Sequence, residues 1–143
     1  MFGQTSEENI WAAGDCASFL LNKSYIRLES VQNAIDQAEA VAENILGSHK
    51  AYNPLPWFWS DQYNIKLQIA GLNTGYDKVI IRNNIKDMSL SHWYFKSEKP
   101  ISVDAINDPR SYMIGKRIIE NNIPVSPEII SDINYDLKKL LRS

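Results

Sequence analysis

The sequence has little of what several common functions require. A single cysteine, Cys16, excludes an intrachain disulfide and any cysteine-based zinc or iron–sulfur site. The formal net charge of -2 lacks the basic excess of nucleic-acid-binding domains. No apolar run approaches the roughly 20 residues of a transmembrane helix, and the N-terminus lacks the pattern of a signal peptide. We therefore expect a cytoplasmic protein that binds neither nucleic acid nor membrane.

Glycine and histidine are also too sparse for several familiar sites. The six glycines form neither the Gly-x-Gly-x-x-Gly cradle for a pyrophosphate nor a P-loop. The two histidines, His49 and His92, lie far apart without the spacing of metal ligands. No histidine lies near Ser60-Asp61, so no nucleophile–base pair is evident. The sequence thus predicts no catalytic residue and no metal site within this chain.

The first third of the chain predicts the end of an α/β domain. A short apolar run at 10–13 stops at Gly14, which is typical of a buried parallel strand, and Asp15 follows where open α/β sheets bind ligands. No partner strand for this run is evident, so most of its sheet is expected to be missing. A helix is predicted over about 30–46, with Ser30 as N-cap and Gly47 after its end. Its buried stripe is predicted to comprise Val31, Ala34, Ile35, Ala38, Val41, Ala42 and Ile45.

The rest of the chain is organised around residues 54–63, which hold two tryptophans, a phenylalanine and a tyrosine. Two prolines make this stretch stiff and extended, and it suits either a core plug or a wall for a flat conjugated ligand. Alternating and short apolar runs then predict an antiparallel meander, and Asp108-Pro109 and Ser126-Pro127 predict helix starts. The predicted strands are 63–70, 78–82, 89–96 and 101–106, and the predicted helices are 108–121, a short one from 126, and 136–141.

These patterns predict an α+β fold, in which an antiparallel β-sheet carries helices on one face. The sequence divides into residues 1–50, which form the remnant of an α/β domain, and residues 51–143, which form the α+β domain.

Five segments of the chain carry a recognisable pattern, in a fixed order. Residues 5–17 are similar to the second FAD-binding motif of pyridine-nucleotide-dependent flavoproteins. The other segments are Arg27-Leu28-Glu29-Ser30-Val31-Gln32-Asn33-Ala34, Pro56-Trp57-Phe58-Trp59-Ser60-Asp61-Gln62-Tyr63, Ile69-Ala70-Gly71-Leu72 and Val103-Asp104-Ala105-Ile106-Asn107. Together they resemble the FAD-dependent ferredoxin reductases of bacterial oxygenase systems, a family that includes putidaredoxin, dioxygenase and rubredoxin reductases.

The resemblance implies a function and a set of site residues. It implies an NAD(P)H-dependent flavoprotein that passes electrons from FAD to a ferredoxin or rubredoxin. Asp15 matches the aspartate at the ribityl–phosphate region of FAD, and Val31 matches the helix start beside the flavin's pyrimidine edge. Trp59 matches the tryptophan near the isoalloxazine and the ferredoxin-docking face, whereas Trp57 is expected to be structural.

The resemblance also implies that upstream FAD and NAD domains are missing. The chain is therefore expected to be a C-terminal fragment that is inactive and retains no FAD. The alternative is a stand-alone dimerisation or protein-interaction domain that has lost redox chemistry, and an unpaired strand at 10–13 is compatible with a homodimer. A disulfide-type reductase is disfavoured because no Cys-x-x-Cys or paired redox cysteine occurs.

Overall fold

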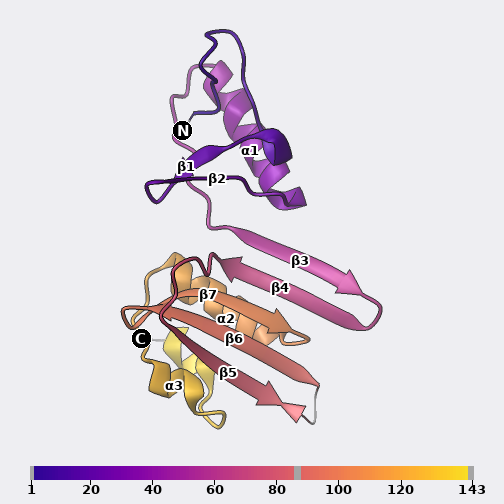
Figure 1. Ribbon diagram of the computed structural model, residues 1–143, viewed down its shortest axis with the longest axis vertical. Helices are drawn as coiled ribbons and strands as arrows, with labels where there is room; N and C mark the ends of the chain where they lie inside the picture. The colour runs from indigo at the N-terminus through magenta and orange to yellow at the C-terminus, as the bar shows by residue number, and fades with distance from the viewer. Residues whose placement is uncertain (1, 86–87, 142–143) are drawn as a thin grey trace. The chain divides into compact units, whose positions relative to one another are not determined.

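The computed structural model describes residues 2–85 and 88–141. The chain forms two compact units, Met1–Pro56 and Trp57–Ser143 (Figure 1). The division that the sequence places between residues 50 and 51 falls inside the loop that leads to Trp57. Each unit is described by itself below.

The first unit combines a β-hairpin with one long helix. The 3-10 helix η1 (Gly14–Cys16) precedes the hairpin of β1 (Phe19–Leu21) and β2 (Ser24–Ile26), and α1 (Val31–Ile45) follows. The two turn residues of the hairpin, Asn22 and Lys23, have φ of 48° and 69°. Positive φ at both positions is what a two-residue turn needs to match the twist of its strands. The sequence patterns did not predict this hairpin.

The strand predicted at residues 10–13 does not form. Trp11 makes a single antiparallel bridge with Gln4. The Thr5 N–H donates to the Ile10 carbonyl and the Ala12 N–H donates to the Gly3 carbonyl, each at 2.9 Å. A parallel strand needs neighbours on its flanks, and in the described residues the nearest chain is the segment just before it. The run therefore folds back locally instead of extending a sheet.

Helix α1 has the predicted ends but not the predicted buried face. The Ser30 side chain accepts a hydrogen bond from the Asn33 N–H, and Gly47 follows the helix with φ 93°. Of the predicted stripe, Val41 is buried as expected and Ala34 is half-buried. Val31, Ile35 and Ile45, which were also expected to be buried, are 61%, 48% and 57% exposed. The residues that α1 buries are Asn33, Gln37, Val41 and Asn44.

The polar face is buried because loops, not a sheet, cover it. Asn44 Nδ2 donates to the carbonyls of Phe2 and Lys50, and Asn44 Oδ1 accepts from the Lys50 N–H at 2.7 Å. Loops bring unpaired backbone groups that need hydrogen-bond partners, and side-chain amides supply both donors and acceptors. The apolar stripe of α1, defined here as Val31, Ile35, Ala38, Ala42 and Ile45, is left facing outward.

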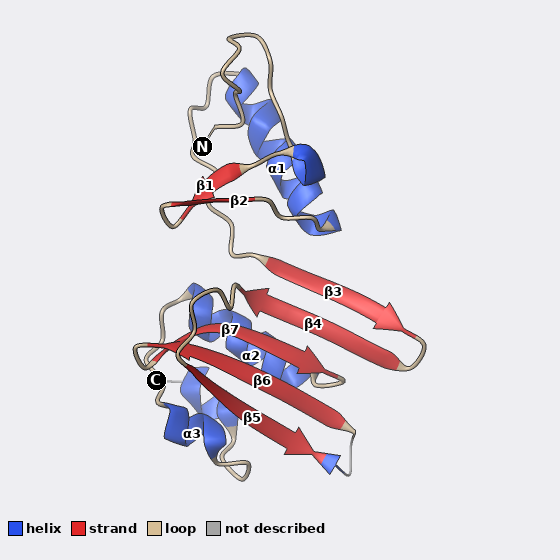
Figure 2. Ribbon diagram, viewed as in Figure 1, coloured by secondary structure: helices blue, strands red, loops and turns tan. Residues whose placement is uncertain are grey.

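The second unit is an antiparallel sheet with helices on one face, which confirms the predicted α+β class (Figure 2). Helix α2 packs on β4 and β7, and α3 packs on β5. The strands are β3 (Trp57–Gln62), β4 (Ile65–Gly71), β5 (Lys78–Asn84), β6 (Ser89–Lys96) and β7 (Lys99–Ile106). The helices are α2 (Pro109–Glu120), α3 (Pro127–Ser131) and the 3-10 helix η3 (Leu137–Leu141).

The strand order β3-β4-β7-β6-β5 corrects the predicted meander. Strands β5, β6 and β7 are successive neighbours, but β7 then pairs with β4, so the β4–β5 link crosses to the far edge of the sheet. Strand β4 ends in two small residues, Ala70 and Gly71. There the Ser102 hydroxyl of β7 donates to the Ala70 carbonyl at 3.0 Å. The aromatic stretch, predicted as an extended connection, forms the edge strand β3.

The core of this unit lies between the sheet and α2. Trp93, Phe95 and Val103 from the sheet are fully buried, as is Ile118 from α2. A Cβ at Gly115 would lie 2.6 Å from Val103 Cγ1, so glycine there permits the close approach of helix and sheet. Asp108 caps α2 by accepting the Ser111 N–H at 2.9 Å, with proline in the first turn as predicted. Across the described residues, no helix is long and apolar enough to cross a membrane.

Candidate functional site

Asp15 lies on a loop that is fixed to helix α1. Its neighbour Gly14 is buried, has φ 78°, and donates its N–H to Gln37 Oε1 at 2.8 Å. A Cβ at Gly14 would touch Ala34 Cβ at 3.4 Å, so the loop lies close against the helix. Asp15 itself is exposed. The backbone is thus held on α1 while the carboxylate is free to accept hydrogen bonds from hydroxyl groups of a ligand.

The hydrogen bond from Gly14 belongs to a buried polar network. Gln37 Oε1 also lies 3.4 Å from Asn33 Nδ2, which donates to the Leu28 carbonyl at 3.0 Å. The Tyr52 hydroxyl donates to Asn33 Oδ1 at 3.1 Å. Burial, together with the charge of Asp36, raises the pKa of Tyr52 to about 12, so this hydroxyl stays protonated at neutral pH. The network joins the Asp15 loop, the start of α1 and the loop at Tyr52.

This network was not predicted from the sequence. Polar side chains recur at 33, 37 and 44, which lie on one face of a helix, and this recurrence could have indicated it. That signal was masked by the apolar stripe on the other face, which was assigned to the interior.

Val31 occupies the first turn of α1. The Ser30 side chain accepts from the Asn33 N–H at 3.2 Å and the Ser30 carbonyl accepts from the Ala34 N–H at 2.9 Å. This cap does not use the N–H groups of Val31 and Gln32. Like the first N–H groups of any helix, they point away from the helix at its N-terminus, where the helix dipole is positive. Asp15 and Val31 therefore belong to one unit, in which Gln37 fixes the backbone of the Asp15 loop to the helix that begins at Val31.

Trp59 lies in the second unit, on edge strand β3. Its ring stacks on Trp57, with ring centroids 5.4 Å apart and planes inclined by 28°. Trp57 packs against the core and lies 6.5 Å from the Tyr112 ring of α2. Both tryptophans thus face the helix side of the sheet, and Phe58 between them faces the other side. Trp59 is half-buried, which leaves part of its ring open to a ligand or partner.

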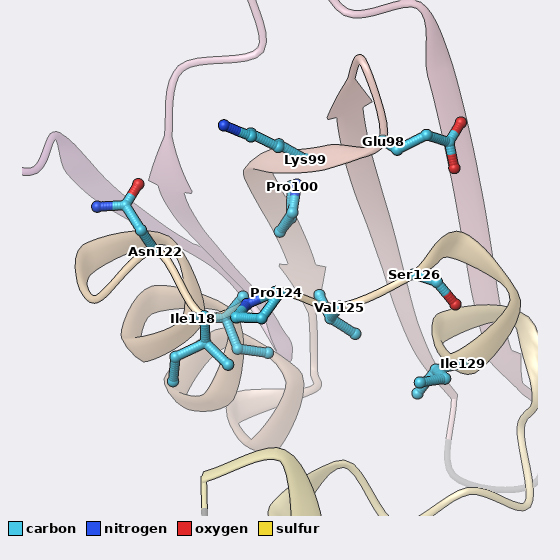
Figure 3. A pocket seen from close by; sticks show the side chains of 10 residues that line it. Glu98, Lys99, Pro100, Ile118, Asn122, Pro124, Val125, Ser126 and Ile129 are labelled. Atoms are coloured by element: carbon cyan, nitrogen blue, oxygen red, sulfur yellow. The ribbon is translucent and has the colours of Figure 1, made fainter. Parts of the chain in front are cut away.

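A cavity of about 400 Å³ lies between the β6–β7 turn and the loop that joins α2 to α3 (Figure 3). It is mainly apolar, and Glu98 at its edge is paired with Lys78 at 2.6 Å. None of Asp15, Val31 and Trp59 lines it. Among the residues that the structure describes, no cluster of histidine, cysteine, aspartate or glutamate could hold a metal ion.

Known proteins are similar to this chain over most of its length. The model of the family "Reductase C-terminal" matches residues 57–141, which is more than half of the chain. The chain belongs to this family. It is 39% identical over 137 residues to rhodocoxin reductase from Rhodococcus erythropolis, a match that covers 94% of this chain and 32% of the relative. The chain thus spans about a third of the length of the curated relatives it matches.

Solved structures agree in fold. The ferredoxin reductase for the CYP199A2 system from Rhodopseudomonas palustris superposes with a TM-score of 0.88 at 42% identity, over 96% of this chain and 34% of that one. The reductase in the covalent putidaredoxin reductase–putidaredoxin complex also gives 0.88, at 36% identity, over 99% and 34%. The resemblance drawn from the sequence is therefore confirmed, and so is the α+β fold of the reductase C-terminal domain.

The first prediction concerns the amide that fixes the Asp15 loop. We expect Gln37→Met to lower the free energy of unfolding of the first unit by about 1–3 kcal/mol, because it leaves the buried Gly14 N–H without an acceptor. The matched control is Gln32→Met on the same helix, where the lost hydrogen bond to Asp36 is only partly buried and the change should stay within about 0.5 kcal/mol. Urea unfolding measures both. Equal stabilities of the two variants would contradict the assigned role.

Proposed function

We propose that this chain is the C-terminal part of an NAD(P)H-dependent flavoprotein that passes electrons from FAD to a ferredoxin or rubredoxin. Its relatives are named as a rhodocoxin reductase and a ferredoxin reductase, and the whole protein's activity is inferred from them. The observation that carries the proposal is in the first unit, where the loop that bears the exposed Asp15 carboxylate is fixed through Gly14 to the helix that begins at Val31. A passive interaction domain has no need for a buried amide that fixes this carboxylate-bearing loop.

The residues present fit one end of FAD. The exposed Asp15 carboxylate would accept hydrogen bonds from sugar hydroxyls in the ribityl–phosphate region. The Val31 N–H and the positive end of α1 would stabilise negative charge at the pyrimidine edge of the flavin. Bound FAD supplies the conversion of a two-electron hydride from NAD(P)H into single electrons. The glycine-rich cradle for its pyrophosphate is not part of this sequence.

The apolar stripe of α1 supports the assignment of residues 1–50 to an FAD-binding domain. Five apolar side chains at helical spacing face outward, which is unusual for a helix of a finished domain. We infer that upstream FAD and NAD domains cover this stripe in the intact protein, which functions in the cytoplasm. Residues 51–143 form the reductase C-terminal domain, where Trp59 serves both the flavin and the docking of the iron–sulfur partner.

The second prediction is that the 143-residue chain alone retains no FAD and is inactive. One carboxylate and one helix end provide too few contacts to hold a dinucleotide without the pyrophosphate cradle. Absorbance at 450 nm after gel filtration, with light scattering on the same peak, measures flavin content and mass together. A yellow chain with stoichiometric flavin would refute the prediction.

The same measurement tests the alternative, a stand-alone dimerisation domain. The exposed apolar stripe is the observation that favours it, since a second copy would cover the same residues. A stable flavin-free dimer would support this alternative, whereas a flavin-free monomer supports the fragment of a larger reductase.

The third prediction concerns Trp59, in a reductase that contains this sequence and holds full FAD. A half-buried tryptophan next to the flavin can anchor the partner as an aromatic hot spot. We expect Trp59→Ala to weaken the apparent affinity for the iron–sulfur acceptor about thirtyfold, which corresponds to about 2 kcal/mol. Turnover with ferricyanide should change little, because this small dye needs no docking surface.

Phe58→Ala is the matched control for Trp59. Phe58 is the adjacent aromatic of the same strand, is 40% exposed, and faces the other side of the sheet. This variant should leave the ratio of the two activities unchanged. If Trp59→Ala reduces both activities alike in flavin-replete protein, Trp59 is a structural plug and has no role in electron delivery.

A further inference from the structure

The Trp57–Trp59 stack is held by a side chain from a different element. Lys116, on α2, places its Nζ 4.9 Å from the centroid of the Trp57 ring. Tyr112, one helical turn earlier on α2, lies 6.5 Å from the same ring. Trp57 is therefore contacted by α2 through two side chains, and by Trp59 through the stack. The position of the Trp59 ring depends on Trp57, which depends in turn on α2.

The Lys116–Trp57 contact has the chemistry of a cation–π interaction. An ammonium group over an indole face is attracted by the ring's quadrupole, and partial burial strengthens the attraction by removing water. Lys116 is half-buried, so its aliphatic stem also packs beneath the charge. None of the ion pairs found among the described residues includes Lys116. The indole ring is thus the group that fixes its ammonium.

The edge position of β3 gives the indole stack support from one strand and from α2. Within the described sheet, β3 pairs with β4 alone, so no strand lies along its other flank. Trp57 packs against the core, and the contacts with Tyr112 and Lys116 of α2 are part of that packing. These contacts help to fix the orientation of Trp57, and the stack transmits that restriction to Trp59.

We propose that Lys116 is a positioning residue for Trp59: through its cation–π contact with Trp57 it fixes the indole stack in the orientation used for electron delivery to the protein acceptor. This inference rests on the function proposed for Trp59. It gives α2 a part in the docking site, through Lys116, which lies 57 residues after Trp59 in the chain.

Three substitutions on α2 test the proposal. Lys116→Met keeps an unbranched apolar side chain but removes the charge, and Lys116→Arg keeps a cation that binds an indole face. Arg117→Met is the matched control, because it removes the same charge from the next, exposed position of the same helix. Each variant is made in the 143-residue chain and in a flavin-replete reductase that contains this sequence.

The first readout is the near-ultraviolet circular dichroism of the chain, which reports the coupling of the stacked indoles without reference to any activity. Lys116→Met should reduce this signal, whereas Lys116→Arg and Arg117→Met should retain it. The second readout is the ratio of turnover with the iron–sulfur acceptor to turnover with ferricyanide. That ratio should fall about fivefold in Lys116→Met, in keeping with a partly buried cation–π contact, and stay near wild type in the other two variants.

Two outcomes would overturn the proposal. If Lys116→Met leaves both the dichroism and the activity ratio unchanged, Lys116 does not position the stack. If Arg117→Met lowers the ratio as much as Lys116→Met, net charge on α2 and not the contact with Trp57 is responsible. The Trp59→Ala variant separates these results from failure of the proposed function: a selective loss there, with none in Lys116→Met, rejects only the role of Lys116.

Discussion

The buried amide of Gln37 is the contact on which the first unit depends. By accepting the Gly14 N–H at 2.8 Å, it fixes the Asp15 loop to α1, and through Asn33 it reaches the loop at Tyr52. Buried polar groups are costly unless they are paired, so a network of this kind tolerates only one arrangement of its loops. The result is that the loop bearing the exposed Asp15 carboxylate keeps a fixed place on α1, which is compatible with the FAD-binding role proposed for it.

Because the polar face of α1 packs against loops of its own unit, the apolar face is left exposed. A helix of a complete small domain ordinarily does the reverse. The inversion makes sense if a further layer of protein covers the apolar stripe, as the length of the relatives suggests. The second unit, by contrast, has a conventional core between sheet and helices, and its distinctive feature is the indole stack at the sheet edge, held from α2 by Lys116.

Local signals predicted part of the local structure. Ser30 and Gly47 marked the ends of α1, and Asp108-Pro109 marked the start of α2. Apolar patterns located β4, β5, β6 and β7, but they missed β1, β2 and β3 and predicted a strand at 10–13 that does not form. The buried face of α1 could not be predicted, because it depends on what covers the helix. The pairing of β4 with β7 was missed because it joins residues far apart in the chain. The same holds within the site: resemblance supplied Asp15, Val31 and Trp59, whereas the residues that hold them, Gln37 and Lys116, become visible only in three dimensions.

We infer that the apolar stripe of α1 is an internal surface of a larger flavoprotein. A cysteine placed at Ile35, in a Cys16→Ser background, reports on it directly through its rate of reaction with a thiol reagent. Ile35 is 48% exposed in this chain, so the new thiol should react readily there. In a flavin-replete reductase that contains the sequence, we expect the thiol to react at least about tenfold more slowly, because the stripe is buried there. Equal rates in the two proteins would contradict it.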